Sequence, residues 1–158
     1  MKYVDIVFAS FYDANTILEI PLDDDFSGTT LAEKRLNVFP KAMKKYNLTY
    51  IFGTDRVVYT ATDNSLAGYY YTMKNGKLEC ELTDPIRFNI YDRIGGGDAF
   101  ASGVIHGLLK DYKNPAYAVR YGLATSVLKH TIYGDASTFS CEDIETFMAA
   151  NGSAEVVR

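Results

Sequence analysis

The sequence predicts an α/β fold with a largely parallel central sheet and helices packed on it. Two apolar runs, residues 3–9 and 48–52, are rich in β-branched and aromatic side chains and are typical of buried strands. The strongest helical pattern follows three consecutive glycines and covers residues 99–109. Between these segments, residues 57–82 predict an antiparallel hairpin region.

Composition restricts the class of protein. The 158 residues are 47% hydrophobic and 23% charged, which suits one globular domain with a core. The net charge of -4 argues against a nucleic-acid surface, and no apolar run approaches membrane-spanning length. We expect no signal peptide, because a charge at Asp5 interrupts the first apolar stretch. Cys80 and Cys141 have no metal-site spacing and predict free thiols in a reducing cytoplasm.

The first elements follow from local patterns. After the strand at residues 3–9, residues 13–20 form a possible short helix that Pro21 ends. Residues 30–46 predict a longer helix, which Pro40 should kink or interrupt. The strand at 48–52 should end in a polar turn at residues 53–56, and open α/β sheets place ligands at such carboxyl ends.

The later elements have clear start and stop signals. Residues 57–62, 68–73 and 77–82 predict three antiparallel strands, with Asn75 and Gly76 as a tight turn between the last two. Asn114 followed by Pro115 begins a helix that runs to about His130. Ser140 and Asp143 predict a capped final helix to about Ala150, which Asn151 and Gly152 end.

The candidate site is the stretch Asp92-Arg93-Ile94-Gly95-Gly96-Gly97-Asp98 and the helix after it. Glycines let backbone N–H groups approach an anion closely, and the helix dipole adds positive charge there. Asp98 would repel a phosphate, so its presence makes sense as a base that takes a proton from a hydroxyl. The alternative is that Asp98 only caps the helix and the glycines only form a turn.

Residues 92–103 resemble the C-terminal signature of the ribokinase-like (PfkB) carbohydrate kinases, and this variant is similar to that of the 2-keto-3-deoxygluconate kinases. Residues 54–56 and 128–135 resemble the same subgroup. The resemblance implies a ribokinase-like three-layer sandwich truncated to its C-terminal half. Residues 1–158 would be the nucleotide-binding part, without the N-terminal half and the lid through which family members often form homodimers.

The resemblance also implies roles for individual residues. Asp98 would be the catalytic base, and Gly95, Gly96 and Gly97 would form the anion hole. Arg93 would join Asp98 in binding the substrate. The implied ATP-binding residues are Thr54, Arg56, His130 and Gly134. Where the family has an Asn-x-x-Glu pattern that organises magnesium, this chain has Ser10 and Asp13, so Asp13 is a candidate metal ligand.

Structural alternatives apply to two of these residues. Asp13 with Ser10 would equally suit a turn and a helix cap, and Arg56 would equally suit the surface of a β-turn. The function implied is ATP- and Mg2+-dependent phosphorylation of a sugar acid hydroxyl, in the cytoplasm. The alternatives are a nucleotide-binding module without turnover, or a kinase of another sugar such as fructose or ribose. No Gly-x-x-x-x-Gly-Lys-Ser/Thr loop is present in the sequence, so an ATP site here is not of the P-loop type.

Overall fold

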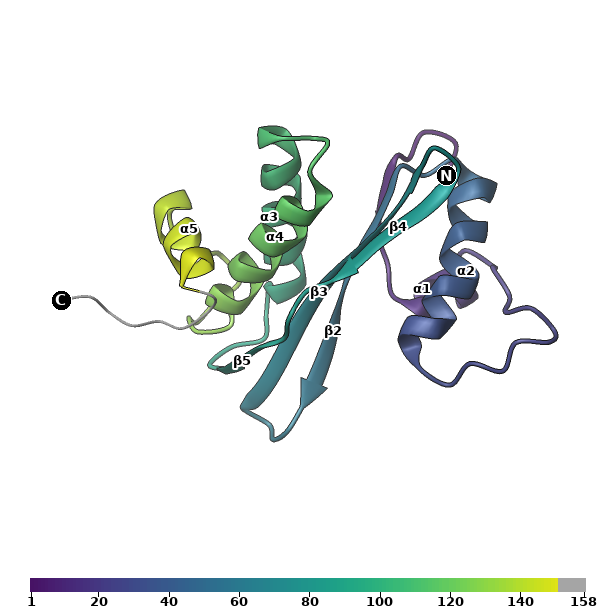
Figure 1. Ribbon diagram of the computed structural model, residues 1–158. Helices are drawn as coiled ribbons and strands as arrows, with labels where there is room; N and C mark the ends of the chain where they lie inside the picture. The colour runs from purple at the N-terminus through teal and green to yellow at the C-terminus, as the bar shows by residue number, and fades with distance from the viewer. Residues whose placement is uncertain (151–158) are drawn as a thin grey trace. The chain divides into compact units, whose positions relative to one another are not determined.

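The structure is a computed structural model in which residues 1–150 are described (Figure 1). It is a mixed α/β fold, as predicted, and its described residues divide into two compact units. The first unit contains Met1–Gly53 and Tyr69–Glu81, and the second contains Thr54–Gly68 and the residues from Leu82 onward. Strands β2 (Tyr50–Val58) and β3 (Asp63–Lys74) contribute residues to both units.

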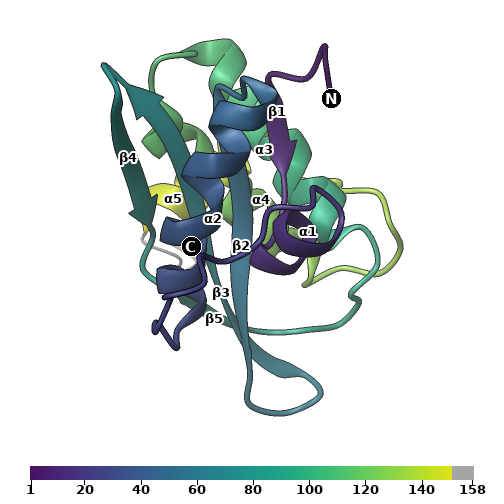
Figure 2. The ribbon, with the colours of Figure 1, turned by 90° about the vertical axis from the view of Figure 1, so that its right-hand side faces the viewer.

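The first unit combines a parallel strand pair with two helices. β1 (Ile6–Phe8), purple in Figure 2, pairs with β2 in parallel, with Ile6 opposite Tyr50. Helices α1 (Phe11–Thr16) and α2 (Leu31–Tyr46) contribute to the apolar core of this unit. Fully buried members of this core are Ala14, Val38, Phe39, Ala42 and Ile51.

Helix α2 is continuous, so the interruption expected at Pro40 does not occur. Proline removes one hydrogen bond of the helix and crowds the preceding turn. On either side of it, Val38, Phe39, Ala42 and Met43 are buried in the core. Because tertiary packing supplies most of the stability of a helix in a protein, this burial outweighs the local cost of the proline.

The prediction of a polar turn at residues 53–56 is wrong, because these residues lie inside β2, which continues to Val58. The separate strand expected at 57–62 is also wrong. Its first residues end β2, and the rest form a turn in which Thr60 donates its N–H to the carbonyl of Asp63. Gly53 fits the middle of a strand because the Tyr69 ring occupies the space that a Cβ would need.

The strands form one sheet with the order β1-β2-β3-β4, and β5 (Ile86–Asn89) pairs with β3 in antiparallel orientation. β4 (Lys77–Leu82) has its expected bounds, and Asn75 and Gly76 both have positive φ, as a tight hairpin turn requires. Neighbouring strands joined by such short turns must be antiparallel. Among the described strands, the expected parallel pairing is therefore confined to β1 and β2.

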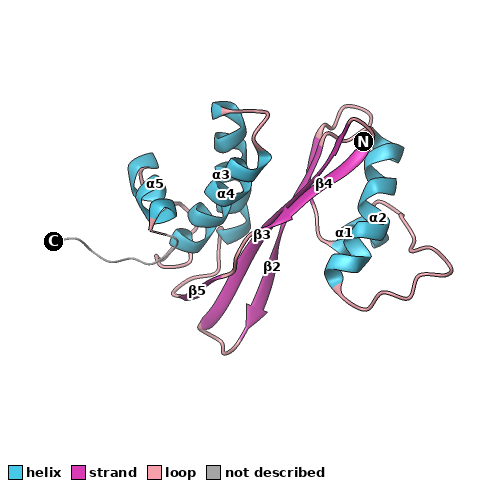
Figure 3. Cartoon of the chain, in the orientation of Figure 1, coloured by secondary structure: helices cyan, strands magenta, loops and turns pink. Residues whose placement is uncertain are grey.

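The second unit contains three further helices, which Figure 3 colours cyan: α3 (Gly96–Lys110), α4 (Pro115–Lys129) and α5 (Cys141–Ala149). Helices α3 and α4 approach closely through small residues. A Cβ on Gly107 would lie 2.6 Å from the Cα of Ala118, and one on Gly103 would lie 2.8 Å from the Cα of Gly122. Ile105 and Leu109 are exposed, so one side of α3 faces solvent.

Candidate functional site

The amino end of α3 is open. Its N-cap, Gly95, has φ 76° and no side chain, whereas Ser10, Thr30, Asn114 and Ser140 cap the other described helices with side-chain oxygens. The N–H of Ala99 donates to the carbonyl of Gly95 at 2.8 Å. Among the described residues, the N–H groups of Gly97 and Asp98 have no acceptor. These two amides are therefore available to a ligand.

The three glycines of the motif differ in what a side chain at each position would meet. Gly95 is in the left-handed region, and a Cβ there would collide with the backbone carbonyl of Asp135. A Cβ on Gly96 would overlap the imidazole ring of His130. A Cβ on Gly97 would meet nothing within 4 Å, and Gly97 is exposed. Packing therefore requires the first two glycines, and only Gly97 faces open space.

Asp98 lies in the first turn of α3 and its side chain is exposed. No side chain caps this helix, so the alternative interpretation of Asp98 as a helix cap is not supported. No hydrogen bond or ion pair joins its carboxylate to another of the described residues. The carboxylate is thus free to accept a proton from a group that binds beside the open amides.

The motif is tied to the last turn of α4 and to the segment that follows this helix. The carbonyl of His130 accepts the N–H of Tyr91 at 2.8 Å. Asp92 accepts the N–H groups of Ile94 and Gly134, at 3.0 and 2.9 Å, and these backbone hydrogen bonds lower the pKa of its carboxyl. The Ser126 hydroxyl donates to the carbonyl of Gly96 at 2.9 Å. These bonds fix the direction in which the first turn of α3 points.

His130 supports this arrangement from inside. The residue is fully buried, and its ring lies 5.1 Å from that of Phe88. Its Nδ1 is 2.6 Å from the carbonyl of Ser126, and its Nε2 is 2.8 Å from the guanidinium of Arg56. Because a carbonyl and a guanidinium can only accept and donate respectively, the ring has its proton on Nδ1. Burial, mainly, lowers the pKa of His130.

This position gives no support to direct contact between His130 and adenine, because the ring is covered and both its nitrogens are occupied. His130 is better described as a positioning residue, since its ring contacts Gly96 and its Nε2 holds Arg56. Sequence reasoning missed the positioning roles of Asp92 and Ser126. The one available signal was that Asp92 is the first residue of the motif.

Two arginines of this unit carry positive charge that no carboxylate among the described residues neutralises. Arg93 donates to the carbonyl of Ala61 at 3.1 Å, and Arg56 donates to His130. Burial, followed by the charge of Arg93, lowers the pKa of the Arg56 guanidinium. Two neighbouring cations without an acidic partner favour an anionic ligand.

The remaining predicted residues are placed as follows. Thr54 is half-buried in β2, and Gly134 has φ 83° and donates to Asp92; both belong to the second unit with the glycine motif. Asp13 belongs to the first unit, where its carboxylate accepts the N–H and the hydroxyl of Ser10, both at 2.7 Å. Its observed role is therefore the helix cap that the sequence offered as the alternative.

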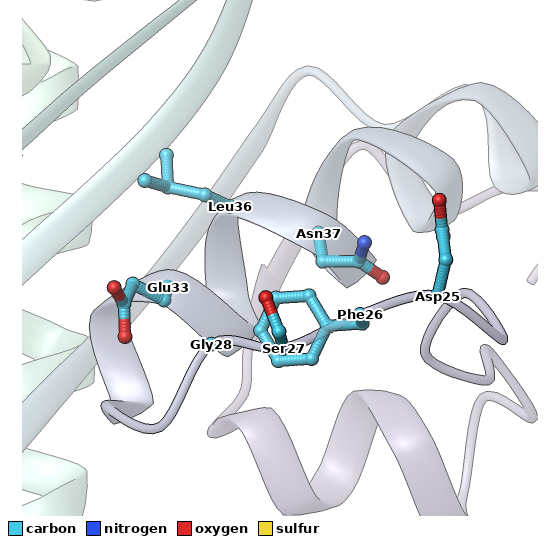
Figure 4. A pocket seen from close by; sticks show the side chains of 7 residues that line it. All are labelled: Asp25, Phe26, Ser27, Gly28, Glu33, Leu36 and Asn37. Atoms are coloured by element: carbon cyan, nitrogen blue, oxygen red, sulfur yellow. The ribbon is translucent and has the colours of Figure 1, made fainter.

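Other features of the described residues stay apart from this site. A hollow of about 520 Å³ in the first unit is lined by residues 25–28 and by Glu33, Leu36 and Asn37 (Figure 4), and none of the predicted site residues lines it. Within residues 1–150, no three His, Cys, Asp or Glu side chains are grouped to hold a metal ion. No helix in this range is both long and apolar enough to cross a bilayer.

Comparisons with known proteins found solved structures only: no family model and no curated protein matches the chain. A candidate 2-keto-3-deoxygluconate kinase from Enterococcus faecalis is 29% identical, with a TM-score of 0.80 over 99% of this chain and 43% of its own. A PfkB family carbohydrate kinase from Listeria grayi is 30% identical, with a TM-score of 0.75. The match covers 92% of this chain and 41% of the Listeria protein. A 2-dehydro-3-deoxygluconokinase from Thermotoga maritima is 29% identical, with a TM-score of 0.74 over 94% and 43%.

A candidate ribokinase II from E. coli is 18% identical with a TM-score of 0.58, and this likeness concerns the fold alone. The chain spans about two fifths of the length of the structures that it matches.

Proposed function

This chain has the fold of part of a ribokinase-like (PfkB) carbohydrate kinase, and we propose that it is the C-terminal, nucleotide-binding part of such an enzyme. The proposed reaction transfers a phosphoryl group from ATP to a hydroxyl of a sugar acid of the 2-keto-3-deoxygluconate type. Two kinases named for this substrate are 29% identical to the chain over at least 94% of its length, which supports this substrate class. We place the reaction in the cytoplasm.

The observation that carries the proposal is the amino end of α3. Two unpaired amides, an open space at Gly97 and a partner-free carboxylate at Asp98 occur within one turn. In the proposed mechanism, Asp98 takes the proton of the attacking hydroxyl, and the N–H groups of Gly97 and Asp98 hold the migrating phosphoryl group. Arg56 and Arg93 would contribute positive charge, to the ATP phosphates and to the sugar acid respectively.

Magnesium would neutralise charge on the phosphates. The described residues contain no cluster of ligands that fits a protein-held ion, so the ion would be held mainly by the nucleotide. A metal-binding role of Asp13 stays a prediction, as do ATP contacts of Thr54 and Gly134.

The test is the substitution Asp98→Asn. ATP binding, measured by calorimetry with Mg2+, should change less than about threefold, because the amides remain in place. Turnover, measured as ADP release with 2-keto-3-deoxygluconate, should fall by at least about a hundredfold, the usual contribution of a general base. Asp111→Asn, at the other end of α3, is the matched control and should leave both unchanged. Detectable turnover that the Asp98→Asn substitution leaves unchanged would remove Asp98 from the mechanism.

A second function, nucleotide binding without turnover, is favoured by one observation: the chain spans about two fifths of the kinases that it matches. Incubating the 158-residue protein with ATP, Mg2+ and a panel of sugar acids, fructose and ribose distinguishes the two functions. Phosphorylated product from this chain alone would exclude the non-catalytic function. The sugar that is phosphorylated would also identify the specificity.

A further inference from the structure

Three helices of the second unit bring together a thiol, an imidazole and a phenol that the proposed kinase reaction does not use. Cys141 is the first residue of α5, and its Sγ lies 3.9 Å from Nε2 of His106 in α3. The His106 ring stacks on the ring of Tyr121 in α4, with 4.7 Å between ring centroids and 24° between planes. Cys141 is exposed, so small molecules in solution can reach the thiol.

The hydroxyl of Tyr121 is a buried donor without an acceptor. Tyr121 is 2% exposed, and its hydroxyl makes no hydrogen bond with acceptable geometry to the described residues. Burial, and then the neighbouring Cys141 thiol, raises the pKa of this phenol, which therefore keeps its proton at neutral pH. A buried hydroxyl without a partner costs about 1–3 kcal/mol. It would gain a partner if the sulfur acquired negative charge or an oxygen atom.

The second cysteine of the chain offers a contrast. Cys80 is also exposed, but it lies in β4, and burial raises the pKa of its thiol. Among the described residues, no histidine contacts it. The two thiols of this protein thus differ in the presence of a proton acceptor, although both are accessible.

We propose that Cys141 is a nucleophilic thiol that reacts with small hydroperoxides, with His106 as its base and Tyr121 as a hydrogen-bond donor to the sulfur. The Cys141 thiol gives its proton to Nε2 of His106, and the thiolate attacks the terminal oxygen of the hydroperoxide. The S–O bond forms as the O–O bond breaks, and the leaving oxygen takes the proton from His106. The sulfur is oxidised to a sulfenic acid, and the hydroperoxide is reduced to water or an alcohol.

The charged groups around the thiol are compatible with this reaction. From α3, Lys110 faces the cluster and forms an ion pair with Glu145 of α5. Tyr117 of α4 packs near Tyr121. In the first turn of α5, the carboxylate of Asp143 accepts the N–H and hydroxyl of Ser140, while Glu142 is exposed. The amino end of α5 favours negative charge on its first residue.

The test uses the 158-residue protein at pH 7 with limiting hydrogen peroxide and dimedone, which traps sulfenic acids. Mass spectrometry of the peptides gives the rate at each cysteine, so Cys80 is an internal control. Cys141 should react about tenfold or more faster than Cys80, because only it has a base. His106→Gln should remove most of this difference. Tyr121→Phe should slow Cys141 without destabilising the protein, because it deletes an unpaired hydroxyl.

Equal rates at the two cysteines in the unmodified protein would overturn the proposal, and this comparison needs no variant. A rate at Cys141 that His106→Gln leaves unchanged would also overturn it, provided that circular dichroism shows a folded protein. Since the experiment contains neither ATP nor a sugar, its outcome does not depend on the proposed kinase function.

Discussion

Two adjacent glycines at the start of α3 should respond in opposite ways to an added methyl group. Gly96→Ala places a Cβ in the imidazole of His130, and such overpacking costs about 1–3 kcal/mol. In Gly97→Ala the added Cβ meets open space at a helical position. This substitution should stabilise the folded protein by about 0.4–1 kcal/mol, because alanine reduces the conformational entropy of the unfolded chain. Urea unfolding of the two variants measures both. A neutral Gly96→Ala would mean that His130 moves easily from its place.

The buried imidazole of His130 makes stability depend on pH. Burial lowers its pKa below the ordinary 6.5, so the unfolded chain binds a proton more tightly than the folded one. Stability should therefore fall as pH falls through 6.5, and should level off above it. Urea unfolding between pH 5 and 8 measures this slope, and His130→Gln should flatten it. An imidazole that NMR shows to be protonated above pH 6.5 would contradict the prediction.

For individual residues, the glycine motif was predictable from the sequence, but the residues that hold it in place were not. Gly95, Gly96 and Gly97 look alike in the sequence, and their difference arises from Asp135 and His130, which lie more than thirty residues away. Asp92 and Ser126 act through backbone groups of other segments, and no local pattern encodes such contacts. The resemblance of residues 128–135 to the kinases predicts His130 at the nucleotide, whereas the burial of His130 depends on tertiary packing.

Helix caps are the elements that local chemistry predicts best. Thr30 and Ser140 form complete capping boxes with Glu33 and Asp143, and Asn114 caps α4 as expected. Ser140→Ala should cost about 1 kcal/mol, because it removes the acceptor of the Asp143 N–H. Thermal unfolding followed by circular dichroism measures the loss. Ser137→Ala, in the exposed segment before α5, is the matched control and should change little.

Strand β2 shows where local prediction ends. Its sequence Gly53-Thr54-Asp55 is typical of a turn, yet the strand continues to Val58, and the Tyr69 ring fills the space beside Gly53. The same limit applies to β5, which the sequence did not predict and which is defined by its pairing with β3. Strand pairing depends on partners that are distant in sequence, so single-sequence patterns do not determine it.

For the whole molecule, the two units should unfold together because β2 and β3 each belong to both. Val38→Ala in the core of the first unit removes fully buried methyl groups and should cost roughly 2 kcal/mol. Hydrogen exchange should then accelerate in α4 of the second unit as well as in α2. Faster exchange confined to α2 would show that the units unfold independently.

The α/β class of the whole molecule was predictable because it depends on the alternation of strands and helices. Each strand or helix pattern can be recognised in the sequence of its own segment. The proportion of parallel pairing was not predictable, because it depends on which strands meet. The short turns after β2 and β3 force the reversals that make the sheet mostly antiparallel among the described strands.

The open amino end of α3 has a consequence for the molecule in its surroundings. Other described helices begin with an oxygen that the chain itself provides, whereas this one leaves two amides to the solvent. Dissolved phosphate, sulfate or a nucleotide can supply the hydrogen-bond acceptor that no side chain provides at this helix end. An anion bound there would stabilise this turn, so we expect the turn to depend on the ionic composition of the medium more than the starts of the capped helices do.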